Sequence, residues 1–273
     1  MKNNQPLAII GGYDMISKAL FTESKKLNNN SIFINLNNNK AKNKKIYNFK
    51  IFQLKKIFET LRVNKIKNLL FIGKINRPNL SYFKNDGEIE KYIPILLNSY
   101  QQGDGKILSS VLRIFIQNGF KIISPMEVSK SFFFNTEELD ELNYNKDVID
   151  VDKSKKLLSE ISKFDNAQAV VCISGYIIAI EAAEGTDNLL NRVFDVRKSL
   201  NQIKFKAGVL VKMPKKSQSK LIDLPVIGLK TLRLVKKANL NGIAIYPKYT
   251  LVHEKIKVLQ YAKKYDLKIY DST

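Results

Sequence analysis

Tryptophan is absent from the 273-residue sequence, and cysteine and histidine occur once each. A single cysteine excludes an internal disulfide and a cysteine-rich zinc site, and a single histidine excludes a multi-histidine metal centre. We interpret Cys172, in the apolar run AVVCISG, as a small core residue, and His253, before a charged amphipathic segment, as a surface or capping residue. The candidate functional groups that remain are carboxylates and lysines. Carboxylates are the ligands that Mg²⁺ and Mn²⁺ prefer.

Long apolar runs are also missing, and acidic residues are few. No run approaches the roughly 20 residues of a membrane-spanning helix, and the start MKNNQPLAIIGG has too short an apolar core for a secretory signal. The net charge is +21, but 40 of the 46 basic residues are lysines spread along the chain without interleaved aromatic residues. We therefore expect a cytoplasmic protein with no specific nucleic-acid partner, whose charge suits an anionic substrate or an anionic membrane surface.

The first half of the chain alternates between apolar strand patterns and amphipathic helix patterns. The expected strands are 6–12, 31–36, 68–75 and 121–125, and the expected helices are 14–27, 52–66 and 103–120. This order is typical of a parallel sheet with crossover helices, so we predict an N-terminal Rossmann-like domain over residues 1–131.

The pattern breaks over residues 132–152, which are acidic and aperiodic, and we predict a connector there. A C-terminal α/β domain is expected over residues 153–273, with a first helix at 152–164, a β-hairpin around Gly175 and later alternating helices and strands. The segment IDLPVIG is expected to be a loop. The overall fold class is therefore α/β with two domains.

Three carboxylates, Glu181, Glu184 and Asp187, crowd the segment IEAAEGTDNLL, where a strand ends and a helix begins at Thr186. Acidic residues in the first turn of a helix are stabilised by its dipole, so a solvated helix start is one interpretation. The other is that the three converge on a cation, because carboxylates that close repel one another without one. Asp223, between apolar neighbours in IDLPVIG, is either a desolvated functional group or a helix cap.

Several motifs, in order along the chain, carry a family resemblance. The segments AIEAAEGTDNLLNRV, AGVLVKMPKKSQSKLIDLPVIGLKTL and ANLNGIAI resemble the C-terminal half of UDP-2,3-diacylglucosamine pyrophosphatases of the LpxI type. The N-terminal half is similar through IIGG, IGKINRP and the pair Gly103-Asp104. It departs from the family where YDMI replaces Leu-Pro after the glycines and where one of two aspartates is missing beside Asp104.

The resemblance implies two domains and a hydrolase that splits the diphosphate of UDP-2,3-diacylglucosamine into UMP and 2,3-diacylglucosamine 1-phosphate in lipid A biosynthesis. It also implies a divalent metal, Mg²⁺ or Mn²⁺, and association with the inner membrane from the cytoplasmic side. The apolar segment SFFF at 131–134 is a candidate for acyl contact or a buried strand end. A homodimer is the default expectation for a small enzyme of this kind.

The residues expected to form the site follow from this resemblance and the motifs. The family's critical aspartate corresponds to Asp223. The expected catalytic residues are Asp223, Lys212 and Lys215, with both lysines neutralising charge on the phosphates. The expected metal ligands are Asp223, Glu181, Glu184 and Asp187. The expected substrate-binding residues are Gly11, Gly12, Arg77, Asp104, Gly185 and Thr186.

Three alternatives stay open at this point. Asp223 acts either as a metal ligand or as a general base beside a metal held by the other carboxylates. The pair Gly11-Gly12 either lets a phosphate approach a helix N-terminus or forms a simple tight turn. The alternatives to a hydrolase are two. One is a nucleotide-sugar oxidoreductase, although GGYDMI lacks the G-x-G-x-x-G fingerprint of such enzymes. The other is a non-catalytic basic protein that binds RNA or a membrane.

Overall fold

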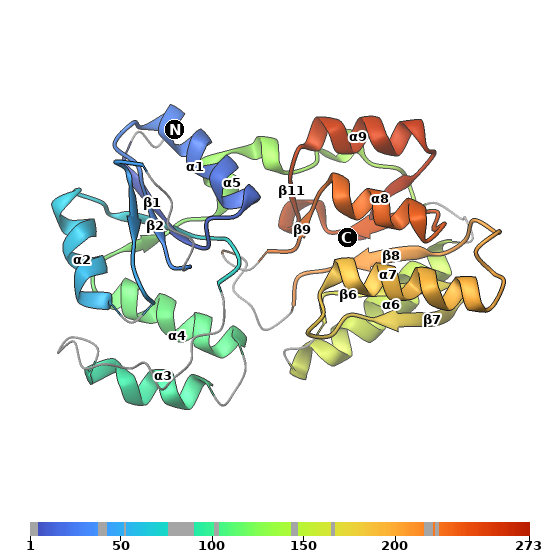
Figure 1. Ribbon diagram of the computed structural model, residues 1–273, viewed down its shortest axis with the longest axis horizontal. Coiled ribbons are helices and arrows are strands. Elements are labelled where there is room, and N and C mark those ends of the chain that lie inside the picture. The colour runs from blue at the N-terminus through green and yellow to red at the C-terminus, as the bar shows by residue number, and fades with distance from the viewer. Residues whose placement is uncertain are drawn as a thin grey trace. The chain divides into compact units, whose positions relative to one another are not determined.

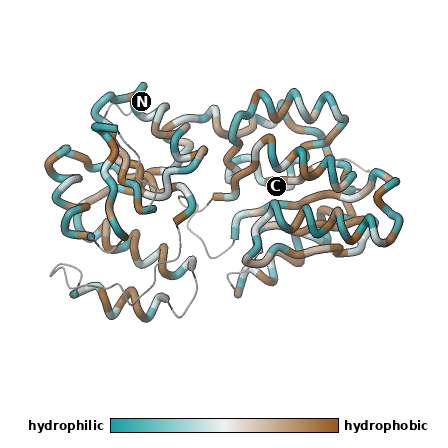
Figure 2. The backbone as a smooth tube through the Cα atoms, viewed as in Figure 1, coloured by the Kyte–Doolittle hydropathy of each residue, from teal (hydrophilic) through white to brown (hydrophobic). Residues whose placement is uncertain are grey.

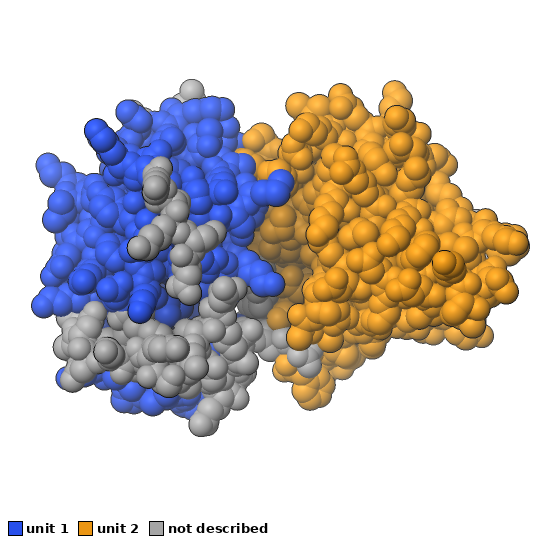
Figure 3. Space-filling model, viewed as in Figure 1, with its two compact units in different colours: residues 1–130, 221–223 blue, residues 131–220, 224–273 orange. Residues whose placement is uncertain are grey.

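The computed structural model describes residues 5–37, 43–51, 53–75, 90–100, 104–142, 147–164, 167–215, 221 and 224–273. The chain divides into two compact units, which Figure 3 shows in different colours. Unit 1 comprises residues 1–130 and 221–223, and unit 2 comprises residues 131–220 and 224–273. Each unit builds its own sheet and its own core.

Unit 1 contains a five-stranded parallel sheet in the order β3-β2-β1-β4-β5. This is the doubly wound order in which the chain starts at the centre and reverses direction between β3 and β4. The Rossmann-like prediction is therefore confirmed (Figure 1). The strands are β1 (Leu7–Gly11), β2 (Ile32–Asn35), β3 (Ile46–Asn48), β4 (Asn68–Phe71) and β5 (Lys121–Ile122).

Helices cover this sheet because apolar residues recur along one side of each. Phe58 and Phe115 come from two different helices and meet edge to face, with ring centroids 5.1 Å apart, over buried strand residues such as Ile34 and Leu69. Figure 2 shows the strands as the most apolar part of the trace. The helices are α1 (Met15–Leu27), α2 (Leu54–Val63), α3 (Ile93–Tyr100), α4 (Asp104–Gln117) and α5 (Pro125–Val128).

Unit 2 is built around a mixed sheet in the order β12-β10-β8-β6-β7. Strands β8, β10 and β12 are parallel, whereas β6 is antiparallel to both β8 and β7. A separate parallel pair joins β9 to β11. The strands are β6 (Ala169–Ile173), β7 (Tyr176–Ile180), β8 (Val209–Lys212), β9 (Val226–Ile227), β10 (Gly242–Ile245), β11 (Leu251–Val252) and β12 (Lys268–Asp271).

The two faces of this sheet carry different helices. Alternate strand residues, such as Leu210 and Ile243, pack against one set of helices, while Val211 and Ala244 pack against α6 on the other face. Burial of both faces explains why these strands are apolar throughout and do not alternate with polar residues. The helices are α6 (Asp147–Ile161) on one face and α7 (Thr186–Ser199), α8 (Leu229–Lys237) and α9 (Lys255–Lys264) on the other.

Helix α6 begins at Asp147, inside the segment expected to be an aperiodic connector. The acidic residues that hid its period point inward. The Asp147 carboxylate accepts hydrogen bonds from Asn241 (2.7 Å) and from the Tyr270 hydroxyl (2.8 Å). The buried Asp150 carboxylate accepts the backbone N–H groups of the β6–β7 turn, and that of Gly175 is 2.6 Å away. A buried carboxylate is tolerated where donors surround it in this way.

Some short elements were not expected from the sequence. IDLPVIG, expected to be a loop, contains β9, and β9 exists only because β11, about 25 residues later, pairs with it. Strand β3 and helix α3 were also not predicted from the sequence pattern. Short 3₁₀ turns lie at Glu90–Tyr92, Lys130–Phe132, Thr136–Glu138, Ser162–Phe164 and Pro247–Tyr249. Among the described residues, none of the helices has the length and apolar character needed to cross a bilayer.

Candidate active site

Three parallel strands of unit 2 end at the same edge of their sheet. Lys212, Ile245 and Asp271 are the last residues of β8, β10 and β12, and the register places them in one row. In open α/β sheets, ligands bind outside the carboxyl ends of the parallel strands. Lys212 is therefore a basic residue at the edge of the sheet where such folds bind their ligands.

Lys212 is 7 % exposed and is held by neighbours from two other motifs. Its Nζ donates to the Thr186 hydroxyl (2.8 Å) and to the Val226 carbonyl (3.1 Å). The Thr186 hydroxyl in turn donates to Glu181 Oε1 (2.8 Å), and Glu181 Oε2 accepts the backbone N–H of Gln168 (3.0 Å). We call these side chains, with the backbone groups of Gln168 and Val226, the Lys212 network.

Local structure explains how Glu181 and Thr186 come together. Strand β7 ends at Ile180 and α7 begins at Thr186, so the chain must turn sharply within five residues. Gly185 has φ = 78°, a conformation that favours glycine, and it is the N-cap residue of α7. The turn brings the Thr186 hydroxyl back toward Glu181.

Glu184 and Asp187 face different basic partners at the surface. Glu184 Oε1 lies 2.7 Å from Arg192, and the hydrogen bond from this guanidinium lowers the pKa of Glu184. Asp187 lies 2.7 Å from Lys230, and the hydrogen bond to Asp187 raises the pKa of Lys230. Exposed pairs of this kind contribute little to stability and exchange readily with solvent.

The three carboxylates of EAAEGTD are thus separated by their partners. Glu181 belongs to the Lys212 network, whereas Glu184 and Asp187 each form an ion pair of their own. Across the described ranges, no three aspartate, glutamate, histidine or cysteine side chains gather in a way that could hold a metal ion. The fourth expected ligand, Asp223, lies outside the described residues, so the expected set of metal ligands stays a prediction.

The remaining expected residues, from both halves of the chain, are placed only in part. Arg77, like Asp223, lies outside the described residues. Asp104 is the first residue of α4. Lys215 is half-buried and follows Lys212 by three residues, beyond the end of β8.

The pair Gly11-Gly12 has a structural explanation. A Cβ atom on Gly11 would lie 1.9 Å from the Ile72 carbonyl oxygen, and one on Gly12 would lie 2.0 Å from that of Lys74. Asp14 caps the N-terminus of α1 by accepting the Ser17 N–H (3.0 Å). Close backbone approach therefore accounts for both glycines, and their expected role in substrate binding stays a prediction.

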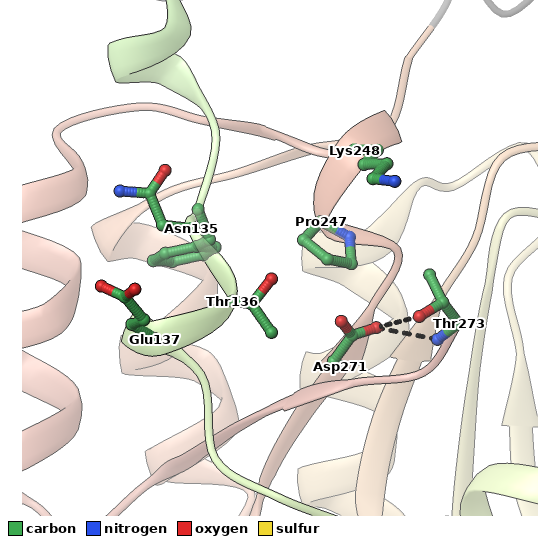
Figure 4. Close-up of a pocket in the computed structure, with 8 residues that line it drawn as sticks. Asn135, Thr136, Glu137, Pro247, Lys248, Asp271 and Thr273 are labelled. Atoms are coloured by element: carbon green, nitrogen blue, oxygen red, sulfur yellow. Dashed lines mark hydrogen bonds between the residues drawn. The ribbon is translucent and has the colours of Figure 1, made fainter.

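A cavity of about 600 Å³ opens beside the ends of β10 and β12 (Figure 4). Asp271 Oδ1 accepts both the N–H and the hydroxyl of Thr273, at 2.8 and 2.7 Å. Two carboxylates and one lysine line the cavity, a balance that does not favour a diphosphate. None of its polar residues was expected from the sequence. The lining residues are Phe134, Asn135, Thr136, Glu137, Pro247, Lys248, Asp271 and Thr273.

The SFFF segment contributes to the core of the chain. All three phenylalanines of this segment, Phe132, Phe133 and Phe134, are buried. They lie at the end of a 3₁₀ turn and directly after it, and not at the end of a strand. Phe134 belongs to the main core of unit 2 and also reaches the cavity of Figure 4.

Comparison with known proteins identifies the family. Residues 6–132 match the family model of the LpxI N-terminal domain, and residues 139–270 match that of the LpxI C-terminal domain. A curated relative, the UDP-2,3-diacylglucosamine pyrophosphatase LpxI of Caulobacter vibrioides, is 33% identical over 190 residues, which cover 69% of this chain and 68% of the relative. The chain therefore belongs to the LpxI family, as its ordered motifs predicted.

Proposed function

We propose that this protein hydrolyses the diphosphate of UDP-2,3-diacylglucosamine to UMP and 2,3-diacylglucosamine 1-phosphate, a step of lipid A biosynthesis. Family membership and the named activity of the Caulobacter relative support the substrate. One structural observation carries the choice of site. Lys212, from the motif GVLVK, hydrogen-bonds to Thr186 of EAAEGTD and to Val226 of DLPVIG, so three separate family motifs meet at one ammonium group.

The reaction needs positive charge at the diphosphate. A water oxygen forms a bond to one phosphorus, the bond from that phosphorus to the bridging oxygen breaks, and the leaving phosphate keeps the electron pair. Lys212 and Lys215 would stabilise the negative charge that develops on these oxygens. Asp223 would either accept the proton of the attacking water or hold a metal ion.

We also propose a requirement for Mg²⁺ or Mn²⁺. Such an ion, when bound, neutralises phosphate oxygens and lowers the pKa of a coordinated water. Asp223 would be its principal ligand, with help from Glu184 or Asp187, whose exposed ion pairs can exchange. Activity should disappear in EDTA and return with Mg²⁺ or Mn²⁺, and full activity after exhaustive chelation would remove the ion from the proposal.

The substrate carries two acyl chains, and we propose that the protein works at the cytoplasmic face of the inner membrane as a peripheral protein. The net charge of +21 and exposed lysines on α8 and α9, such as Lys236, Lys237, Lys263 and Lys264, support attraction to anionic lipids. Co-sedimentation with vesicles containing anionic lipid should weaken from low to high salt. Vesicle binding that salt does not change would contradict the proposed electrostatic attraction to the membrane.

We also propose that the protein is a homodimer. Size-exclusion chromatography with light scattering tests this oligomeric state.

The activity is tested by incubating the purified protein with UDP-2,3-diacylglucosamine and Mg²⁺ and separating the products. UMP and 2,3-diacylglucosamine 1-phosphate should appear in equal amounts, and the Lys212→Met variant should release them roughly 10²–10³-fold more slowly. Substrate that stays uncleaved after prolonged incubation with folded wild-type protein would overturn the proposed function.

A further inference from the structure

We propose that Thr186 and Glu181 are positioning residues that hold the Lys212 ammonium at the reacting edge of the unit 2 sheet. This inference rests on the proposed function, because it assumes that Lys212 acts on the diphosphate. It gives Thr186 and Glu181 roles other than substrate contact and metal binding. The two residues act on the reaction only through Lys212.

The hydrogen-bond directions in the Lys212 network follow from the chemistry of its groups. An ammonium group only donates, and an ionised carboxylate only accepts. The Thr186 hydroxyl must therefore accept from Lys212 and donate its one hydrogen to Glu181, as the 2.8 Å distances on both sides permit. The second Glu181 oxygen is fixed by the Gln168 N–H at 3.0 Å. The network thus orders the end of a long side chain that would otherwise rotate freely.

Burial gives this arrangement an electrostatic consequence. Lys212 and Thr186 are 7 % and 8 % exposed, so the ammonium has lost most of its hydration. A carboxylate in direct contact would compensate the charge but would also compete with an anionic substrate. Because the Thr186 hydroxyl lies between them, Glu181 supports the positive charge from a greater distance, where the Coulomb attraction is weaker. The network therefore positions the ammonium at the sheet edge through the Thr186 hydroxyl, and not through a direct salt bridge to Glu181.

A role limited to starting helix α7 does not explain these contacts. The N-cap residue of α7 is Gly185, which has no side chain with which to cap this helix end. Thr186 uses its hydroxyl for Glu181 and Lys212 instead. The sequence spacing serves the same end, since Glu181 follows the last residue of β7 and Thr186 is the first residue of α7.

The test compares Thr186→Val, which keeps the shape but removes the hydroxyl, with Thr186→Ser, which keeps it. Steady-state kcat and KM for UDP-2,3-diacylglucosamine are measured together with the melting temperature. Thr186→Val should lower kcat roughly 10- to 100-fold with little change in KM, because a hydrogen bond to a charged group is lost. Thr186→Ser should restore most of the rate. Thr60→Val, on helix α2 of unit 1, is the matched control, since among the described residues the Thr60 hydroxyl bonds only to the Lys56 carbonyl of its own helix.

The double variant Thr186→Val with Lys212→Met decides whether the effect passes through Lys212. If Thr186 acts only by positioning that ammonium, its removal should have no further effect on kcat once Lys212 is methionine. Glu181→Gln keeps an acceptor for Thr186 but removes the charge, so a smaller loss of kcat is expected, which should also vanish in the Lys212→Met background. If Thr186→Val does not fold, the Glu181→Gln pair supplies the same comparison.

Three results would overturn the inference while leaving the proposed function intact. The first is a Thr186→Val variant with the kcat of the wild type, measured beside a slow Lys212→Met variant. The second is a double variant in which the two single effects on kcat multiply. The third is a Thr186→Val variant whose KM rises while its kcat is unchanged. The last would show that Thr186 contacts the substrate. Failure of the wild-type protein to release UMP would instead refute the proposed function itself.

Discussion

Arg197 offers a prediction whose size can be worked out from the structure. This residue of α7 is 1 % exposed, and the described residues give it no carboxylate partner. Its guanidinium donates to five backbone carbonyls at 2.5–3.4 Å, from two loops that lead into β8 and β10. They are the carbonyls of Gln202, Phe205, Ala207, Ala238 and Asn239. Burial lowers the pKa of Arg197, but arginine stays charged at any ordinary pH.

Arg197→Met keeps an apolar stem of similar length and removes every donor. Hydrogen bonds to charged groups contribute about 1.5–3 kcal/mol each, but the cost of burying the guanidinium offsets most of their sum. The variant leaves buried carbonyls without their donor, at about 1–3 kcal/mol for each one that water does not reach, so we expect a total loss of about 3–5 kcal/mol. At roughly 3 °C per kcal/mol for a domain of this size, unit 2 should melt about 10 °C lower.

Calorimetry of the variant and the wild type measures this change, with unfolding of the two units fitted as separate transitions. Arg233→Met, at an exposed arginine of α8 in the same unit, is the control and should shift the transition little. Because the Arg197 contacts lie at the start of β8 and β10, away from Lys212, kcat at low temperature should stay unchanged. A melting temperature within about 2 °C of wild type would refute the assignment of Arg197 as the connection between these loops.

Three further predictions concern single groups. Asp223→Asn should lower kcat by ~10² or more while substrate binding and melting temperature persist, and a destabilised but active variant would identify Asp223 as a helix cap. Burial, with the nearby Asp150 charge, raises the pKa of Cys172 to about 12, so its thiolate fraction at pH 8 should be roughly 10³-fold below that of an ordinary thiol, and rapid labelling of the native protein would contradict this. The charge of Lys206, with Lys268, lowers the pKa of Asp266, so this carboxylate stabilises the fold above its unfolded value of 3.8, and the contribution is lost as pH falls through the lower folded value. Wild type and Asp266→Asn should therefore differ in melting temperature at pH 7, and the difference should shrink as the pH falls below 3.8. A difference that does not shrink with falling pH would contradict the linkage.

Much of the fold was predictable because its signals are local. The first strand, Leu7–Gly11, is a continuous apolar run, and α1 follows with apolar residues at helical spacing. Such strands and crossover helices allow few topologies, so the parallel sheet of unit 1 follows from their order. The ordered motifs around Glu181, Lys212 and Asp223 likewise indicated the family from sequence alone.

The residues that are available for chemistry can be identified from their types and motifs, but the contacts that each one makes cannot. Glu181 and Thr186 are close in sequence, yet their relation to Lys212 exists only because β7, α7 and β8 lie together in the folded unit. Asp147 read as part of an acidic connector because its partners, Asn241 and Tyr270, are about 100 residues away. Hydrogen bonds between distant segments leave no periodic pattern, since period reports only which face of one element is buried. The tertiary structure therefore decided which carboxylates hold a lysine, which hold the fold together and which remain at the surface.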